Sequence, residues 1–135
     1  MSVNFWAVFV SALASMVIGS VWYGPLFGKK FRVAMGMDKW SAEKQAQMKK
    51  SMGMSFALQF IASLVMFYIL AVFMHAGVGG VTGNLAIAFW TWLGFVVPVK
   101  LGDAIWGGSW TLFWIGISNM LVTLLAAGAI IGAWR

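Results

Sequence analysis

Four stretches of this chain are apolar over a length that matches the thickness of a lipid bilayer. They cover residues 3–23, 54–74, 84–99 and 110–134, and the first of them contains no charged residue. About 20 residues of α-helix rise about 30 Å, which is the thickness of the hydrocarbon layer. Because that layer offers no water to backbone polar groups, a spanning segment must satisfy them internally as a helix. The sequence therefore predicts an all-α fold, an integral membrane four-helix bundle.

The composition agrees with a lipid environment. Of the 135 residues, 62% are hydrophobic and only 9% are charged, whereas soluble domains are about 25% charged. Such a chain has too few polar side chains to cover its surface in water. Its length fits a single transmembrane domain over residues 1–135, with residues 24–53 as a basic segment between the first two spans.

The positive charges are concentrated in one place, which predicts the orientation of the bundle. Seven of the nine Lys and Arg residues lie between Lys29 and Lys50. Cytoplasmic loops carry an excess of these residues, so we expect residues 24–53 in the cytoplasm and both termini outside a cell inner or plasma membrane. We expect membrane lipids rather than nucleic acid as partners. The basic residues expected to contact lipid headgroups are Lys29, Lys30, Arg32, Lys49 and Lys50.

Small residues recur at helical spacing in the first and last spans. Helices in lipid gain little from apolar contact with one another, so their association depends on close backbone approach. The expected helix-packing positions are Ala7, Ser11, Ser15, Gly19, Gly128 and Gly132. At these positions the helices contact either other helices of the same chain or helices of a second chain. Because four helices enclose a small interior, we expect a homo-oligomer and favour a dimer.

Two spans share a short motif. Residues 22–25 read Trp-Tyr-Gly-Pro, and residues 92–94 read Trp-Leu-Gly, with Pro98 following. One interpretation is a weak repeat of two helical hairpins, and the other is chance in a chain rich in aromatic residues and glycine. Pro98 removes the helical partner of the Gly94 carbonyl, which predicts either a simple kink or a carbonyl freed towards a polar cavity.

Several polar and aromatic side chains fall inside the predicted spans. Gln59 and Ser63 share one helix face, as do Asn119 and Thr123. Such groups turn inward and pair, so they either join helices or line a path for a solute. Trp92 either packs in the core or forms the wall of a site, and Asp103 either pairs with Lys100 at the membrane boundary or faces inward. The candidate cavity-lining residues are Gln59, Ser63, Trp92, Asn119 and Asp103.

The sequence offers little material for catalysis or for holding a cofactor. It contains no cysteine and one histidine, His75, which has no carboxylate near it in the sequence. We find no catalytic triad, carboxylate pair or glycine-rich phosphate motif. We therefore expect no metal, no cofactor and no enzymatic activity.

The chain resembles the domain-of-unknown-function 1761 family. The resemblance rests on the segment GSVWYGPLFG at residues 19–28, supported by WLGFV at residues 92–96 and by the small-residue ending at residues 128–134. It extends over nearly the whole chain and implies a small membrane protein of several helices. It implies no activity.

Two functions remain as hypotheses from the sequence. In the first, a small oligomeric membrane protein forms a binding or permeation path for a small solute or ion. In the second, a structural or accessory subunit binds another membrane protein or anionic lipid through the basic segment.

Overall fold

The computed structural model describes residues 3–77 and 79–134, and every regular element in them is a helix. Four helical segments are long and apolar enough to cross a membrane, which confirms the all-α prediction. The first comprises α1 (Phe5–Val21) and η1 (Trp22–Leu26), and the second is α3 (Ala42–Ala76). The third comprises α4 (Gly80–Thr91), η3 (Trp92–Val96) and α5 (Val97–Ile105), and the fourth is α6 (Trp110–Ala133).

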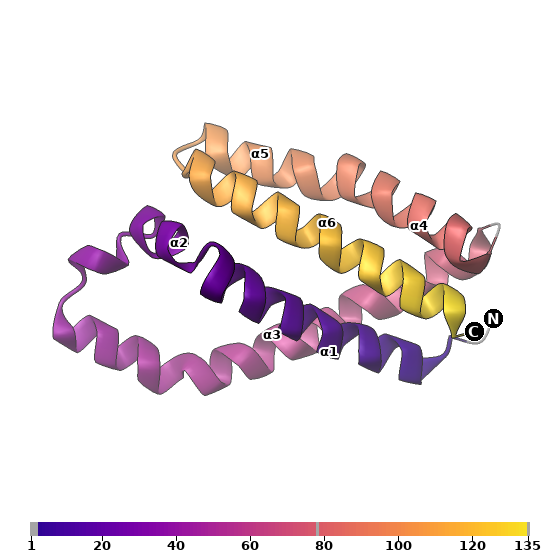
Figure 1. Cartoon of the computed structure of the whole chain (residues 1–135), viewed down its shortest axis with the longest axis horizontal. Coiled ribbons are helices and arrows are strands. Elements are labelled where there is room, and N and C mark those ends of the chain that lie inside the picture. The colour runs from indigo at the N-terminus through magenta and orange to yellow at the C-terminus, as the bar shows by residue number, and fades with distance from the viewer. Residues whose placement is uncertain (1–2, 78, 135) are drawn as a thin grey trace.

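Helix α6 is the centre of the bundle. It packs against α4 and α5 on one side and against α1 on the other (Figure 1). Half of its most apolar stretch is buried inside the chain, compared with 6% for the third segment. The first and third segments are therefore arranged around α6, and their outward faces are left for lipid or for another chain.

Two glycines bring α6 into backbone contact with α4. A Cβ atom on Gly132 would lie 2.8 Å from Cα of Val81, and one on Gly128 would lie 3.0 Å from the carbonyl oxygen of Asn84. Neither position has room for a side chain. These two glycines thus contact a helix of the same chain, which is the close approach that association in lipid requires.

The ends of the chain lie together at a tightly packed end of the bundle. Asn4 caps α1 by accepting a hydrogen bond from the Trp6 N–H (3.0 Å), and its amide donates to the Trp134 carbonyl (2.8 Å). The adjoining core is formed by buried residues of α1, α3, α4 and α6, among them Ala7, Ala12, Phe67, Met74, Ala88, Leu124 and Ile131. The buried Ser11 belongs to the same contact.

Two short π-helical segments correct the predicted ends of the spans. The Phe27 N–H donates to the Trp22 carbonyl at 2.9 Å, five residues back, so the wider turn bypasses the missing N–H of Pro25. The proline therefore does not end the first segment at residue 23. In η3 the Val97 N–H likewise donates to the Trp92 carbonyl. The third segment accordingly continues to Ile105, and Asp103 lies in α5 rather than in a loop.

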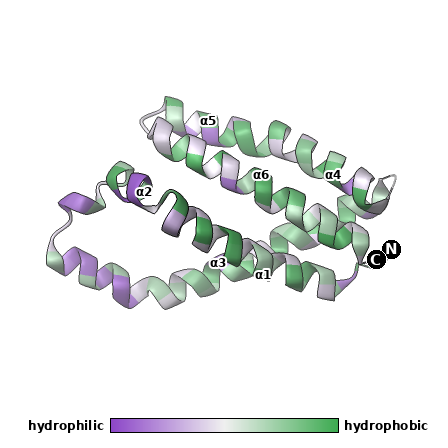
Figure 2. Ribbon diagram, viewed as in Figure 1, coloured by the Kyte–Doolittle hydropathy of each residue, from purple (hydrophilic) through white to green (hydrophobic). Residues whose placement is uncertain are grey.

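Helix α3 diverges from the other helices at the end away from the termini (Figure 1). Its 35 residues measure about 52 Å, well beyond one hydrocarbon thickness. Residues 41–59 are exposed, and hydrophilic residues gather here and on α2 (Gly28–Ala34), as Figure 2 shows. The short η2 (Met37–Lys39) connects α2 to α3. The basic segment between the first two spans is therefore helical in part.

Gly132→Leu should lower the free energy of unfolding by about 1–3 kcal/mol, because the new side chain forces α4 away from α6. Gly53→Ala is the matched control, since a Cβ there meets nothing within 4 Å and alanine favours the helix by up to about 1 kcal/mol. Unfolding in mixed micelles, followed by circular dichroism, measures both. Equal stability of the two variants would contradict the α4–α6 contact.

Candidate functional site

A polar cavity of about 720 Å³ occupies the space where α3 diverges from α1 and α6. We call it the α3 cavity. Its walls come from Ser15–Gly24 on the first segment, Phe56–Met66 on α3 and Gly116–Thr123 on α6, with Lys100 entering from α5. The packed core of Phe67 and Leu124 lies on the side of the chain ends. The cavity therefore lies in the half of the bundle that carries the basic segment.

Two polar atoms in the wall of this cavity have no hydrogen-bond partner. They are Nδ2 of Asn119 and Oγ1 of Thr123, one helical turn apart on α6. The Thr123 side chain is only 4% exposed. An unpaired buried amide or hydroxyl costs about 1–3 kcal/mol. This face of α6 is therefore less stable than an apolar face of the same shape would be.

The serine hydroxyls of the cavity, in contrast, are already bonded within their own helices. Ser63 Oγ donates to the Gln59 carbonyl (2.9 Å), and Ser15 Oγ donates to the Ala12 carbonyl (2.6 Å). Their protons are engaged, so these oxygens act towards the cavity as acceptors. The donors that remain are the amides, the threonine hydroxyl, Tyr23 and Lys100.

Lys100 reaches the cavity from α5 and passes close to Gly116 of α6. Cε of Lys100 lies 4.0 Å from the position that a Cβ on Gly116 would occupy. A Cβ at position 116 would make an ordinary van der Waals contact with the lysine side chain. Lys100 is exposed and is the one charged residue among those that line the cavity.

Two tryptophans fix both π-helical segments to adjacent residues of α6. Trp22 Nε1 donates to Ser118 Oγ at 3.0 Å, and Trp92 Nε1 donates to the Ile117 carbonyl at 2.7 Å. Each tryptophan is the first residue of its segment, η1 or η3. The two occurrences of Trp-x-Gly thus share a backbone form and an anchoring bond, and they hold the α6 wall of the cavity from both sides.

The sequence-predicted residues divide between this cavity and other places. Gln59, Ser63 and Asn119 all line the α3 cavity, and so do Ser15 and Gly19 of the small-residue stripe. Trp92 packs against the core instead. Asp103 is exposed on α5, and in the described part of the chain it forms no ion pair with Lys100.

Sequence reasoning missed Lys100 and Gly116 as members of the site. The lysine was assigned to the end of a span, where a charge normally marks the membrane boundary. The spacing between residues 100 and 116 carries no local signal, because α5 and α6 come together only through the turn at residues 106–109.

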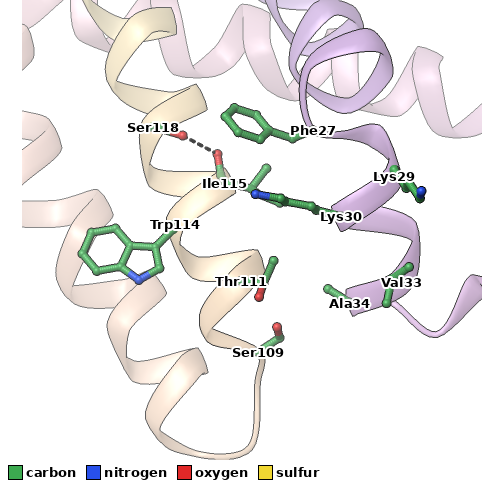
Figure 3. A pocket seen from close by; sticks show the side chains of 10 residues that line it. All are labelled: Phe27, Lys29, Lys30, Val33, Ala34, Ser109, Thr111, Trp114, Ile115 and Ser118. Atoms are coloured by element: carbon green, nitrogen blue, oxygen red, sulfur yellow. Dashed lines mark hydrogen bonds between the residues drawn. The ribbon is translucent and has the colours of Figure 1, made fainter.

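A second hollow, a cleft of about 950 Å³, separates α2 from α6 (Figure 3). We call it the α2–α6 cleft. Its lining is mostly apolar, with Phe27, Val33 and Trp114 beside the hydroxyls of Ser109 and Thr111. Lys30 extends across it towards α6, whereas Lys29 points away. Of the other expected headgroup residues, Arg32 and Lys49 line a neighbouring hollow, and Lys50 is exposed on α3.

Within residues 3–77 and 79–134, no group of three His, Cys, Asp or Glu side chains is arranged to hold a metal ion. His75 lies near the packed end of α3 and bonds to the Ala71 carbonyl through Nδ1 at 2.9 Å.

Comparison with known families gives one match. The model of a family described as a protein of unknown function (DUF1761) matches residues 6–132, which is nearly the whole chain. Neither a curated protein nor a solved structure matches the chain.

Proposed function

Since the chain belongs to the DUF1761 family and has four helices long enough to cross a bilayer, we propose that it binds a small polar solute or ion in the α3 cavity and provides a path for it within the membrane. The observation that carries this proposal is the pair of unpartnered polar atoms of Asn119 and Thr123 in the cavity wall. Buried polar groups are normally paired, and a bound solute would pair with both after a small rotation of their side chains.

The size and lining of the cavity support binding of a small molecule. Ligand sites are mostly apolar hollows of about 300–1,000 Å³ with a few placed polar groups. The α3 cavity has that volume, and Met16, Phe56 and Met120 accompany its polar groups. No reaction is needed in this scheme, so the chain acts by binding and not by catalysis.

The direction of access follows from the basic segment. Seven of the nine Lys and Arg residues lie between Lys29 and Lys50, and in the proposed topology this end faces the cytoplasm with both termini outside. The cavity lies in the half of the bundle that carries the basic segment, with the packed core on its other side, so the proposed topology puts it in the cytoplasmic half. A solute would then enter from the cytoplasm, and release on the other side would require α3 to move.

Association of two or more copies is part of the proposal. The third segment is the least covered of the four, with Trp90 65% exposed and Phe95 72% exposed on its surface. A second copy of the chain would cover this face and leave the α3 cavity of each copy intact.

Thr123→Val and Asn119→Leu should each raise the stability of the empty protein and reduce solute flux. Removing an unpaired buried polar group recovers about 1–3 kcal/mol, while the solute loses a partner. Stopped-flow light scattering of proteoliposomes measures the flux of urea, glycerol, glycine, acetate and methylammonium. We expect wild type to transport at least one of them and the variants to slow it at least tenfold.

Thr82→Val is the control, because Thr82 is exposed at the start of α4, far from the cavity in the chain. It should change neither stability nor flux. If wild-type vesicles are no more permeable than empty ones to every probe, and no probe raises the unfolding temperature, the proposed function is wrong.

The α2–α6 cleft favours a second function: the chain would be an accessory membrane protein that binds anionic lipid. Lys30 extends across a cleft with an apolar floor, and Lys29 adds a second positive charge beside it although its side chain points away; this suits a phosphate headgroup and the start of an acyl chain. Basic residues near an anionic surface contribute about 1 kcal/mol each.

The double substitution Lys29→Gln and Lys30→Gln should therefore weaken binding of phosphatidylglycerol, relative to phosphatidylcholine, by about 2 kcal/mol. Lys44→Gln with Lys50→Gln removes the same charge outside the cleft and should have a smaller effect. Native mass spectrometry of lipid-bound protein measures both. Equal losses in the two double variants would indicate a general surface charge effect instead of a site.

A further inference from the structure

We infer that the solute of the α3 cavity is a small organic anion with an apolar body, whose charged group is held by Lys100 and the amide of Asn119. This rests on the proposed function, because it names the class of solute that the same cavity takes. Three observations lead to it: the charge of the lining, the path of the lysine, and the distribution of apolar side chains.

The charge of the lining is positive. Among the residues that line the cavity, Lys100 is the one charged group, and the donors around it are neutral. The three acids of the chain are Asp38, Glu43 and Asp103, and none of them lines the cavity. Asp103 follows Lys100 by three residues on α5 but forms no ion pair with it in the described part of the chain, so the ammonium group remains available to attract an anion and repel a cation.

The lysine side chain lies beside α6 at Gly116. Gly116 presents no side chain, and Cε of Lys100 lies 4.0 Å from where its Cβ would be. The π-helical turn η3 precedes α5 and adds one residue, which rotates the following residues by about 100° around the helix axis. The wide turn thus sets the rotation of α5 that places Lys100 beside Gly116, at the cavity.

Asn119 completes the anion site from the same helix as Gly116, three residues further on and so on a neighbouring part of one face. Its Nδ2 has no partner in the structure, and an amide N–H donates readily to a carboxylate oxygen. The ammonium of Lys100 and this amide are donors that an anion can engage without breaking a hydrogen bond of the protein, and the Thr123 hydroxyl lies one turn further along α6.

The apolar side chains of the lining indicate an organic anion. Methionines from three helices and one phenylalanine share the cavity with the polar groups: Met16, Met66, Met120 and Phe56. Flexible methionines adapt to apolar groups of varied shape. A volume of about 720 Å³ also leaves room around a bare halide, which would remain hydrated.

Three probes of one shape and different charge test the inference: benzoate, benzamide and benzamidinium. Each is titrated by calorimetry against the full chain in nanodiscs of phosphatidylcholine, which carry no net charge. We expect benzoate to bind at least tenfold more tightly than benzamide, and benzamidinium to bind most weakly. This comparison uses the wild-type protein and needs no variant.

Lys100→Gln should reduce the affinity for benzoate about 10- to 100-fold, the range of a charge-assisted hydrogen bond, and leave benzamide unchanged. Lys100→Arg keeps the charge and should retain most of the affinity. Lys50→Gln removes an equal charge from the exposed part of α3 and should alter neither probe.

Different results would overturn the anion assignment and the proposed solute path. Equal affinity of wild type for benzoate and benzamide, or benzoate binding that survives Lys100→Gln, overturns the anion assignment while the cavity remains a solute site. Failure of all three probes to bind overturns the assignment as well. The proposed function falls only if, in addition, the uncharged and zwitterionic probes show no flux.

Discussion

The close approach of α6 to α4 and α1 at one end of the bundle determines the rest of the structure. Gly128 and Gly132 leave no space between α6 and α4, and Ala7, Ser11 and Ala12 are buried where α1 joins the same core. In lipid, such contact substitutes for the hydrophobic force that packs soluble helices. Because packing is concentrated at the terminal end, α3 is free to separate from its neighbours at the other end. The cavity is the space left by that separation.

The two π-helical segments give this cavity a defined wall. Pro25 and the glycines of both Trp-x-Gly motifs lie where an α-helix is easily interrupted, and the wider turns keep each segment continuous across the interruption. The indoles of Trp22 and Trp92 then bond to adjacent residues of α6. A π-turn often marks a functional position, and here the two turns flank the part of α6 that carries Gly116, Asn119 and Thr123.

Much of the fold follows from the sequence because it depends on local properties. Apolar length predicts the four membrane segments, and four-residue spacing correctly joins Gln59 with Ser63 and Asn119 with Thr123 on single faces. The first and third helical segments continue beyond residues 23 and 99, because a wide turn keeps the first helix continuous across Pro25 and α5 extends the third to Ile105. Lys100 was missed for a tertiary reason: its place in the cavity depends on the rotation produced by η3 and on the packing of α5 beside α6, sixteen residues away at Gly116. The divergence of α3 likewise has no signature in its own residues.

The proposed solute path opens between α3 and α6 on the side of the basic segment and ends at the packed core. The chain contains no cysteine, so a thiol reagent can react only with a cysteine introduced by substitution. Gln59→Cys and Asn119→Cys should react with a charged, membrane-impermeant thiol reagent applied from the side of the basic segment. Phe67→Cys in the core and Val65→Cys on the outer surface of α3 should resist it from both sides. Protection of residues 59 and 119 equal to that of residue 67 would contradict the account.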